Sequence, residues 1–408
     1  MILLDKIQLD KEWKISLFPT KKFSTVSIAV YFYDKLQDSV KFEENTLFFY
    51  WFSYLKKKIL VEKFGFDVAE RFVCSTSLFF NNQLKTYGTR IIHPKYSDCY
   101  DQDLENIVDE LVNVLIHTKD LTEDLMRKAK QDLIAKIQRQ FANPFAYSTA
   151  RLLETAFQNK RYGTDVFGNI DIYQNLDFSF LRKAEEYLDF LQQQDKHIFI
   201  LGNLRLNGST FQKEDRFLHS KPVIVNSNFY ETEVRKDSIN QTIITLGFSC
   251  VNIECFQDYL NMQLIDGMLG KYGHSKLFER LRKKNIAPYH VISRYDMMCN
   301  VLLVSVCVPC KYEKQTVDEM IENILRFEIN SAYLEKTKQF FKNEVFYLLD
   351  TPEGTMSYLN MIKTFAVSLD DIELELSKIT CESLSNFFCD NVEYIGAHVL
   401  RGSKIGEN

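Results

Sequence analysis

The sequence predicts an α+β fold of two duplicated domains, each with a mixed or antiparallel sheet and helices packed on one side. Three observations support this prediction. The 408 residues are enough for two domains with separate cores. The order strand, helix, strands, two helices occurs twice along the chain. Residues of a long helix in each half recur at a constant offset of 208: Lys130-Gln131, Ile137 and Pro144 return as Lys338-Gln339, Val345 and Pro352.

The first half contains five elements with clear patterns. Residues 24–33 predict a strand because they are rich in β-branched and aromatic side chains. Residues 41–60 predict a helix with an aromatic face, and residues 71–93 predict a β-hairpin around two asparagines. Apolar residues three and four apart then predict amphipathic helices over 104–117 and 122–141.

The second half repeats this order, with elements expected over 242–250 (strand), 257–270 (helix), 287–309 (strands), and 315–327 and 333–349 (helices). In both halves the long helix ends just before a proline, because the residue preceding a proline avoids the helical conformation.

The domain boundaries follow from the stretch between the halves. Residues 207–239 contain Asn-Gly-Ser, mixed charges and little periodicity, which is typical of a linker. We therefore expect an N-terminal domain over 1–206, a linker over 207–239 and a C-terminal domain over 240–408.

The composition argues against several classes of partner. A net charge of −5 gives no basic footprint for nucleic acid or an anionic membrane, so proteins, peptides or small molecules are the expected partners. The most apolar stretch, 301–309, is far shorter than the roughly 18–20 residues that span a bilayer, so no membrane span is expected. The N-terminus lacks the pattern of a signal peptide, which predicts a cytoplasmic protein.

Cysteine and histidine usage bears on metal and redox chemistry. The nine cysteines are odd in number and several lie in apolar runs, so we expect reduced thiols packed in the core, including the pair Cys307 and Cys310. No two of the seven histidines are closer than 16 residues. A helical metal site with two imidazoles one turn apart is therefore absent from the sequence.

One segment is specific enough to indicate a family. It reads Leu269-Gly-Lys-Tyr-Gly-His-Ser-Lys-Leu-Phe278, and Arg282 and Tyr289 follow it. This resembles the C-terminal half of the pitrilysin/insulinase family of inverzincin metallopeptidases, where a Gly-rich turn and Ser-x-Leu-Phe precede an Arg, with a Tyr seven residues later. Weaker resemblance covers nearly all of the chain, and the family's duplicated α+β halves match the predicted fold.

The resemblance also shows what the chain lacks. Catalytic members carry His-x-x-Glu-His on the first helix and a further Glu in the helix before the Asn-Pro, to bind zinc and activate water. Here Lys41 and Asn45 stand where the histidines belong, Glu44 is retained, and Ala135-Lys136 stand where the distal Glu belongs. We expect no metal and no cofactor in this chain, and we interpret Glu44 as part of a solvated first turn.

The family includes heterodimers, such as mitochondrial processing peptidase and paired bacterial relatives, in which one subunit lacks zinc ligands. The resemblance is to that subunit type. It implies a catalytic metallopeptidase partner that holds the zinc, a peptide substrate, and a supporting role for Arg282 and Tyr289 at the partner's active site. Bacterial pairs suggest processing of precursor or leader peptides, including those of modified bacteriocins. The alternative is a non-enzymatic peptide-binding or scaffold protein with the same fold, and a third, weaker alternative is an independent enzyme that uses Cys and His residues.

The residues themselves support a role for Arg282 and Tyr289, because a guanidinium and a phenol that converge on a peptide carbonyl stabilise the oxyanion formed on attack. The alternative is that Arg282 belongs to a solvated basic helix end and that Tyr289 packs on a sheet. We rank Gly270, Gly273, His274 and Ser275 lower as substrate contacts, since a turn with Ser275 capping the next helix explains them.

Exposed edge strands are a further candidate site, because family members are implied to hold substrate as an added strand. Residues 24–33 or 287–293 could provide such an edge, and the sequence does not separate the two.

Overall fold

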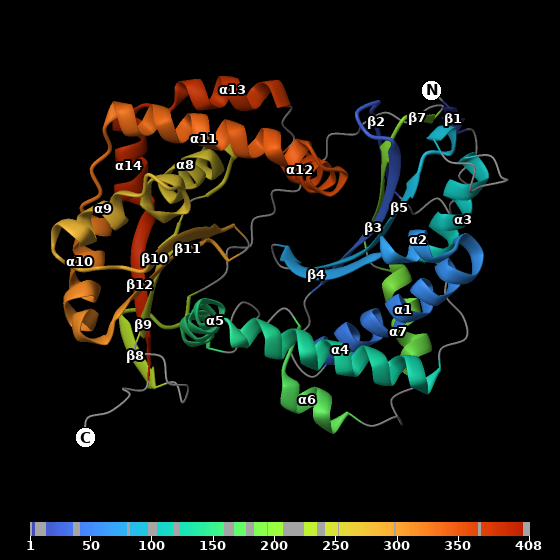
Figure 1. The fold of residues 1–408 in the computed structure, drawn as a ribbon, viewed down its shortest axis with the longest axis horizontal. Coiled ribbons are helices and arrows are strands. Elements are labelled where there is room, and N and C mark those ends of the chain that lie inside the picture. Colours follow the sequence, from blue (N-terminus) through green and yellow to red (C-terminus); the bar gives the residue numbers. More distant parts are fainter. Residues whose placement is uncertain are drawn as a thin grey trace. The chain divides into compact units, whose positions relative to one another are not determined.

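Two five-stranded sheets form the centres of the two units of the protein (Figure 1). The computed structural model describes residues 2–4, 14–35, 41–79, 82–96, 104–116, 122–158, 167–176, 183–193, 195–206, 224–234, 241–251, 253–297, 299–365 and 369–402. Unit 1 comprises Met1–Gln138, Val166–Lys213 and Leu349–Ser357. Unit 2 comprises Arg139–Asp165, Glu214–Leu348 and Tyr358–Asn408.

The unit 1 sheet has the strand order β2-β6-β3-β5-β4. Its strands are β2 (Lys14–Pro19), β3 (Thr25–Lys35), β4 (Val73–Phe79), β5 (Asn82–Ile92) and β6 (Asp195–Gly202). Only β2 and β6 pair in parallel among these neighbours. A separate parallel pair joins β1 (Ile2–Leu4) to β7 (Leu204–Leu206). The first half of the chain also contains η1 (Pro94–Tyr96), α1 (Lys41–Phe64), α2 (Phe66–Glu70), α3 (Leu104–Ile116), α4 (Glu123–Ala142), α6 (Ile170–Asn175) and α7 (Lys183–Gln193).

The unit 2 sheet has the strand order β10-β11-β9-β12-β8. Its strands are β8 (Phe229–Val234), β9 (Gln241–Cys250), β10 (His290–Asp296), β11 (Val301–Pro309) and β12 (Val392–Arg401). Here only β8 and β12 are parallel. The remaining elements are α5 (Pro144–Phe157), α8 (Phe256–Asp266), the π-helix η3 (Gly267–Lys271), α9 (Lys276–Lys283), η4 (Cys310–Tyr312), α10 (Glu313–Leu325), α11 (Ser331–Leu349), α12 (Pro352–Thr364), α13 (Leu369–Lys378) and α14 (Cys381–Asn391).

The two sheets confirm the duplication. Taken in chain order, the five strands of each sheet occupy the same positions, and the parallel pair joins the first and last strands in both. The repeated lysine has the same role in each half. The ammonium of Lys130 in α4 donates to the carbonyl of Leu176 at 2.8 Å, and that of Lys338 in α11 donates to the carbonyl of Ile379 at 2.8 Å. Both carbonyls lie just past a helix end, where backbone acceptors lack helical partners.

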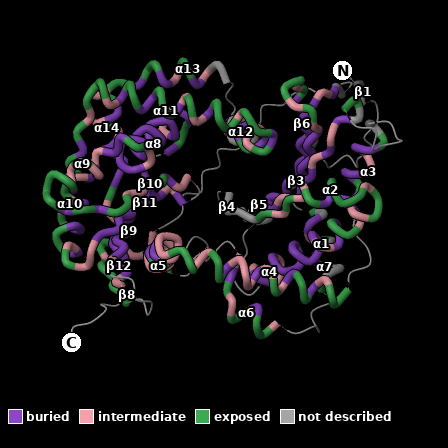
Figure 2. Tube along the Cα trace, viewed as in Figure 1, coloured by how far each residue is buried: buried purple, intermediate pink, exposed green. Residues whose placement is uncertain are grey.

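Helix α5 belongs to unit 2, although it lies inside the first half of the sequence. Its Phe145 and Tyr147 pack against a small cluster of Ile243, Cys307 and Leu400 on the sheet. Successive side chains of a strand point to opposite faces of its sheet. All residues of β9 after Gln241 are buried (Figure 2), so its side chains are buried on both faces. The unit 2 sheet is therefore covered on both faces, with α5 on one of them.

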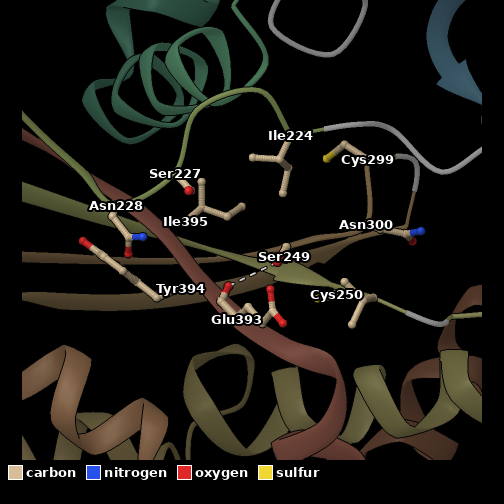
Figure 3. Close-up of a pocket in the computed structure, with 11 residues that line it drawn as sticks. Ile224, Ser227, Asn228, Ser249, Cys250, Cys299, Asn300, Glu393, Tyr394 and Ile395 are labelled. Carbon is tan, nitrogen blue, oxygen red and sulfur yellow. Dashed lines mark hydrogen bonds between the residues drawn. The ribbon is translucent and has the colours of Figure 1, made fainter.

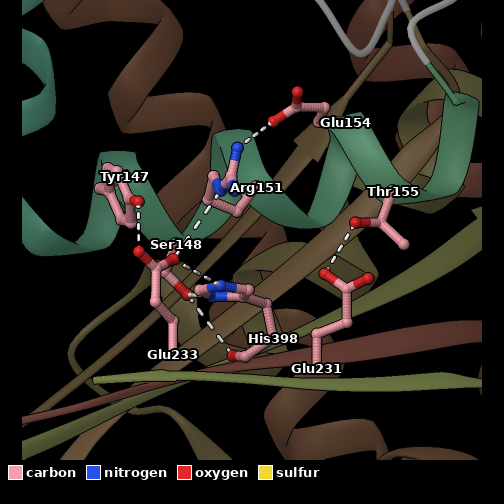
Figure 4. A network of polar contacts seen from close by, with 8 residues as sticks. All are labelled: Tyr147, Ser148, Arg151, Glu154, Thr155, Glu231, Glu233 and His398. Carbon is pink, nitrogen blue, oxygen red and sulfur yellow. Dashed lines mark hydrogen bonds and ion pairs between the residues drawn. The ribbon is translucent and has the colours of Figure 1, made fainter. Parts of the chain in front are cut away.

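A polar network fastens α5 to β8 and β12 (Figure 4). The hydroxyl of Ser148 lies 2.9 Å from Nδ1 of His398, which is 2% exposed. Nε2 of the same ring lies 3.7 Å from a carboxylate oxygen of Glu233, and the phenol of Tyr147 donates to Glu233 at 2.7 Å. Burial lowers the pKa of His398, and the nearby carboxylates of Glu233 and Glu231 oppose this only in part.

We expect stability to fall as the pH drops from about 7 towards 5, because His398 has a lower pKa in the folded chain than its ordinary value of about 6.5. As the pH falls, the unfolded chain therefore binds the proton first. The contribution of the imidazole to the free energy of unfolding is complete above about pH 6.5 and decreases below it, by at most about 1.4 kcal/mol per pH unit. Urea denaturation at several pH values measures this slope. His398→Asn should reduce it, whereas Ser148→Ala, which keeps the imidazole, should not. An equal slope in His398→Asn and the unchanged chain would contradict the prediction.

Four sequence expectations differ from the structure. The linker 207–239 contains β8, which becomes a strand by pairing with β12; residues 207–223 and 235–240 lie outside the described residues. The expected helix 257–270 is α8 followed by a π-helix. Residues 139–165 of the first half belong to unit 2, and residues 349–357 of the second half belong to unit 1. The units therefore do not follow the expected contiguous boundaries.

The fourth difference concerns the cysteines. The described cysteines are free, and Cys250, Cys299 and Cys307 are buried as expected. The prediction of core thiols is wrong for Cys255 and Cys389, which are exposed, and Cys74, Cys310 and Cys381 are only partly buried. Cys255 is the N-cap of α8, and Cys389 lies on the outer face of α14. Both are exposed because neither position packs against a core. Cys99 lies outside the described residues.

No helix in the part of the chain that the structure describes is both long and apolar enough to cross a membrane.

Candidate functional site

The start of α1 carries the positions where catalytic relatives bind zinc. The carboxylate of Glu44 pairs with the ammonium of Lys183 at 3.2 Å and is 14% exposed, so it is a partly covered ion pair rather than a fully solvated one. Asn45 is half-buried, and the side chain of Lys41 lies outside the described residues. The neighbouring Glu43 is buried, which raises its pKa, while backbone N–H groups of Glu43 and Asn169 act in the opposite direction.

Helix α4 brings a second ammonium to α1. Nζ of Lys136 lies 4.1 Å from the centroid of the Tyr50 ring and 3.2 Å from a carboxylate oxygen of Asp132. Across the described residues, no three His, Cys, Asp or Glu side chains gather in a way that could hold a metal ion. Lys136, which stands where the resemblance expects the distal Glu, therefore lies beside α1. The absence of zinc from the isolated chain stays a prediction.

The Gly-rich segment forms the connection between α8 and α9. An added Cβ at Gly270 would lie 2.7 Å from the backbone nitrogen of Ser293, so glycine allows the π-helix to approach β10. The hydroxyl of Ser275 accepts a hydrogen bond from the backbone N–H of Phe278 at 3.3 Å, which confirms Ser275 as the N-cap of α9. The same hydroxyl donates to the carbonyl of Leu269. Gly273 is exposed and has open space around it.

His274 is buried in this connection, at 8% exposure. Its Nε2 lies 3.0 Å from the hydroxyl of Thr337 in α11, and its ring packs beside Tyr272 and Phe340. Burial lowers the pKa of His274. These contacts join η3 to α11, so the side chain of His274 is directed into unit 2.

Of the basic side chains at the C-terminal end of α9, two are held by partners on α10 and Arg282 is not. Arg280 donates to the amide oxygen of Asn323 at 2.8 Å, and Lys284 pairs with Glu319 at 3.0 Å. Both partners lie on α10. Arg282 is exposed, and within the described residues its guanidinium has no hydrogen-bond or ion-pair partner. Its Cζ lies 4.3 Å from the centroid of the Phe278 ring.

Tyr289 stands immediately before β10. Its backbone N–H donates to the carbonyl of Cys307 at 2.8 Å, which fixes the start of the strand against β11. The side chain is 60% exposed, so it does not pack on the sheet as the structural alternative required. The next residue, His290, meets Phe145 of α5 with ring centroids 5.6 Å apart. The sequence marks Pro144 as a helix boundary, but gives no signal that Phe145 would lie beside His290.

The remaining candidates are resolved by their surroundings. Residues 24–33 form the interior strand β3, whereas β10 is at the sheet edge, so only 287–293 keep the edge-strand interpretation. Burial raises the pKa of the Cys307 thiol to about 11, which disfavours a reactive thiolate. Its sulfur lies 3.3 Å from the amide oxygen of Gln241.

A pocket of about 370 Å³ lies at the opposite end of the unit 2 strands from Tyr289 (Figure 3). Asn228, Ser249, Asn300 and Glu393 are among its polar lining residues, and Cys250 and Cys299 also line it. Asn228 and Asn300 adopt positive φ values of 57° and 50°, which asparagine tolerates better than most residues.

Comparison with known proteins gives a consistent result. A family model described as the peptidase M16 inactive domain matches residues 175–340. The chain is 38% identical over 395 residues to AlbE, an antilisterial bacteriocin subtilosin biosynthesis protein of Bacillus subtilis, with 95% of this chain and 100% of AlbE covered. It is 22% identical over 272 residues to YmfF of Bacillus subtilis strain 168, a probable inactive metalloprotease, covering 62% of each chain. A crystal structure of a conserved protein from Enterococcus faecalis V583 shares the fold, with a TM-score of 0.76, 18% identity, and 96% and 97% of the two chains covered.

Proposed function

The chain belongs to the peptidase M16 (pitrilysin/insulinase) family, and because it lacks the family's His-x-x-Glu-His motif, we propose that it is the non-catalytic subunit of a heterodimeric zinc metallopeptidase. In this proposal a partner with the intact motif holds the zinc and activates the water. This chain binds the peptide substrate and completes the partner's active site, in the cytoplasm, without a metal or cofactor of its own.

The observation that carries the proposal is the state of Arg282 and Tyr289. Both side chains are exposed, and neither the guanidinium nor the phenol has a hydrogen-bond partner among the described residues, although the neighbouring Arg280 and Lys284 are anchored to α10. Two unoccupied donors near the start of an edge strand suit a bound peptide. They would hold the carbonyl of the cleaved bond and stabilise the negative charge that develops on its oxygen.

The relative AlbE gives the proposal a substrate class. AlbE is a bacteriocin biosynthesis protein, and 100% of its length aligns with this chain. We extend the proposal to the processing of a bacteriocin precursor or leader peptide. Glu44 takes no catalytic part in this scheme, since it is paired with Lys183.

Co-expression tests the proposal. The chain is purified with a candidate His-x-x-Glu-His protein encoded by a neighbouring gene, and cleavage of the precursor peptide encoded nearby is followed by mass spectrometry. We expect a stable complex that cleaves the peptide, with little cleavage by either chain alone. Absence of a complex, or equal cleavage by the partner alone, would favour the alternative of a non-enzymatic peptide-binding or scaffold protein. Stoichiometric zinc in the isolated chain would overturn the assignment of the metal to the partner.

A further inference from the structure

An aromatic ring lies directly beneath the guanidinium on which the proposed function depends. Phe278 and Arg282 are one helical turn apart on α9, and Cζ of Arg282 lies 4.3 Å from the centroid of the Phe278 ring. This is well within the roughly 6 Å at which a cation over an aromatic face is attracted by it. We propose that Phe278 is a positioning residue that holds Arg282 ready for the substrate carbonyl; this inference depends on the function proposed above.

The kind of contact matters, because it leaves the hydrogen-bonding groups of the guanidinium unoccupied. A guanidinium carries five N–H donors in its plane and presents a flat face above and below it. Arg280 donates one of its N–H groups to Asn323, and Lys284 pairs with the carboxylate of Glu319. Among the described residues the guanidinium of Arg282 has no such bond, and its Cζ lies over the ring of Phe278. A carboxylate partner would also fix the side chain, but would compete with the substrate for the same N–H groups.

The Gly-rich segment 269–278 holds the backbone of Phe278 in place, and so positions its ring. The backbone of Phe278 is tied to the hydroxyl of Ser275, and that hydroxyl is tied to the carbonyl of Leu269 in η3. Gly270 lets η3 lie against the backbone of β10, the strand that Tyr289 precedes. One continuous set of contacts therefore connects both donors. This explains Gly270 and Ser275 as parts of the frame rather than as substrate contacts.

The contact itself is tested without any partner. Phenylglyoxal modifies arginine side chains, and mass spectrometry of the full chain gives a rate for each arginine. Replacing the ring in Phe278→Leu frees the guanidinium, so Arg282 should be modified about two- to fivefold faster, in line with the usual strength of an exposed cation–π contact. Arg326 caps the C-terminal end of α10, is 79% exposed and pairs with Glu322 of that helix, so its modification rate is the internal reference and should not change. In Phe278→Tyr, which keeps an aromatic ring, Arg282 should be modified at the same rate as in the unchanged chain.

The positioning role is tested in the complex with the catalytic partner, using the precursor peptide as substrate. We expect Phe278→Leu to lower kcat about two- to fivefold with little change in KM, and Phe278→Tyr to restore it. In an Arg282→Ala background, Phe278→Leu should have no further effect, because the ring acts through the guanidinium. Thermal unfolding checks that the variant is folded, and Phe278→Met is the replacement if Phe278→Leu is not.

Each other outcome is decisive. Equal modification of Arg282 with and without the ring would overturn the contact. Faster modification with unchanged kcat, in a complex whose cleavage still depends on Arg282, would overturn the positioning role and leave the proposed function intact. A further fall in kcat in the Arg282→Ala background would show a merely structural role. Cleavage by the complex that does not depend on Arg282 would overturn this inference together with the role proposed for Arg282, whereas the proposed subunit function fails only if no complex forms or the partner cleaves equally well alone.

Discussion

In the complex with its catalytic partner, the double change Arg282→Ala and Tyr289→Phe is expected to reduce kcat for peptide cleavage by at least about 10²–10³-fold. Removal of one preorganised donor to an oxyanion typically costs about that factor, equivalent to about 2.7–4 kcal/mol. Among the described residues neither donor has a hydrogen-bond partner, so substrate gains both without breaking any of the hydrogen bonds described there. Steady-state kinetics on the precursor peptide measure the effect, and KM should change less than kcat, because the charge on the carbonyl oxygen develops on the way to the transition state.

Lys283→Ala is the matched control for this experiment. Lys283 is exposed on the same last turn of α9 and has the same charge as Arg282. If net positive charge near the site were sufficient, Lys283→Ala would impair cleavage in the same way. We expect it to stay within a few-fold of the unchanged complex, as is usual for a charge outside the site. Unimpaired cleavage by the double variant would contradict the supporting role of Arg282 and Tyr289.

The sequence predicted the elements that depend on local patterns. Helix α9 begins where Ser275 can cap it, and α5 begins at a proline after Asn143, whose side chain accepts from the backbone N–H groups of Phe145 and Ala146. The repeat at an offset of 208 correctly indicated two sheets of the same topology. These features follow from residues that are close together in the chain, or from the same short pattern appearing twice.

Partners far apart in the chain could not be predicted in this way. Pro144 marks where a helix starts but carries no information on the sheet against which α5 packs, and the strand β8 has too little alternation to be distinguished from a linker. The exposure of Tyr289 depends on β10 being an edge strand, which is a property of the sheet order. Arg280 and Lys284 bond to α10, whereas Arg282 has no hydrogen-bond partner among the described residues, and this difference depends on how α9 packs against α10.

Gly270→Ala is expected to lower the free energy of unfolding by about 1–2 kcal/mol, although alanine is the better helix former. Helix propensity alone predicts a gain of about 1 kcal/mol. The new Cβ, however, would lie 2.7 Å from the backbone nitrogen of Ser293 and 3.0 Å from the carbonyl carbon of Ile292. These are backbone atoms of β10, and forcing extra volume into a packed site typically costs about 1–3 kcal/mol.

The steric cost of the added Cβ should exceed the gain in helix propensity because β10 is bonded to both β11 and the end of α8. Ile292 and Ser293 are paired with Ser305 and Val304 of β11, and the hydroxyl of Ser293 donates to the carbonyl of Asp266 at 2.8 Å. The strand therefore cannot move away from η3 without losing these bonds, and the steric cost exceeds the gain in propensity.

Gly273→Ala separates this steric effect from the general effect of replacing a glycine in the same turn. Within the described part of the chain, and apart from its sequence neighbours, no heavy atom lies within 4 Å of an added Cβ at Gly273. The variant should therefore be neutral or stabilised by up to about 1 kcal/mol through a less flexible unfolded chain. Urea denaturation of both variants measures the difference in the free energy of unfolding. Equal shifts for Gly270→Ala and Gly273→Ala would show that close approach of η3 to β10 is not what requires glycine at position 270.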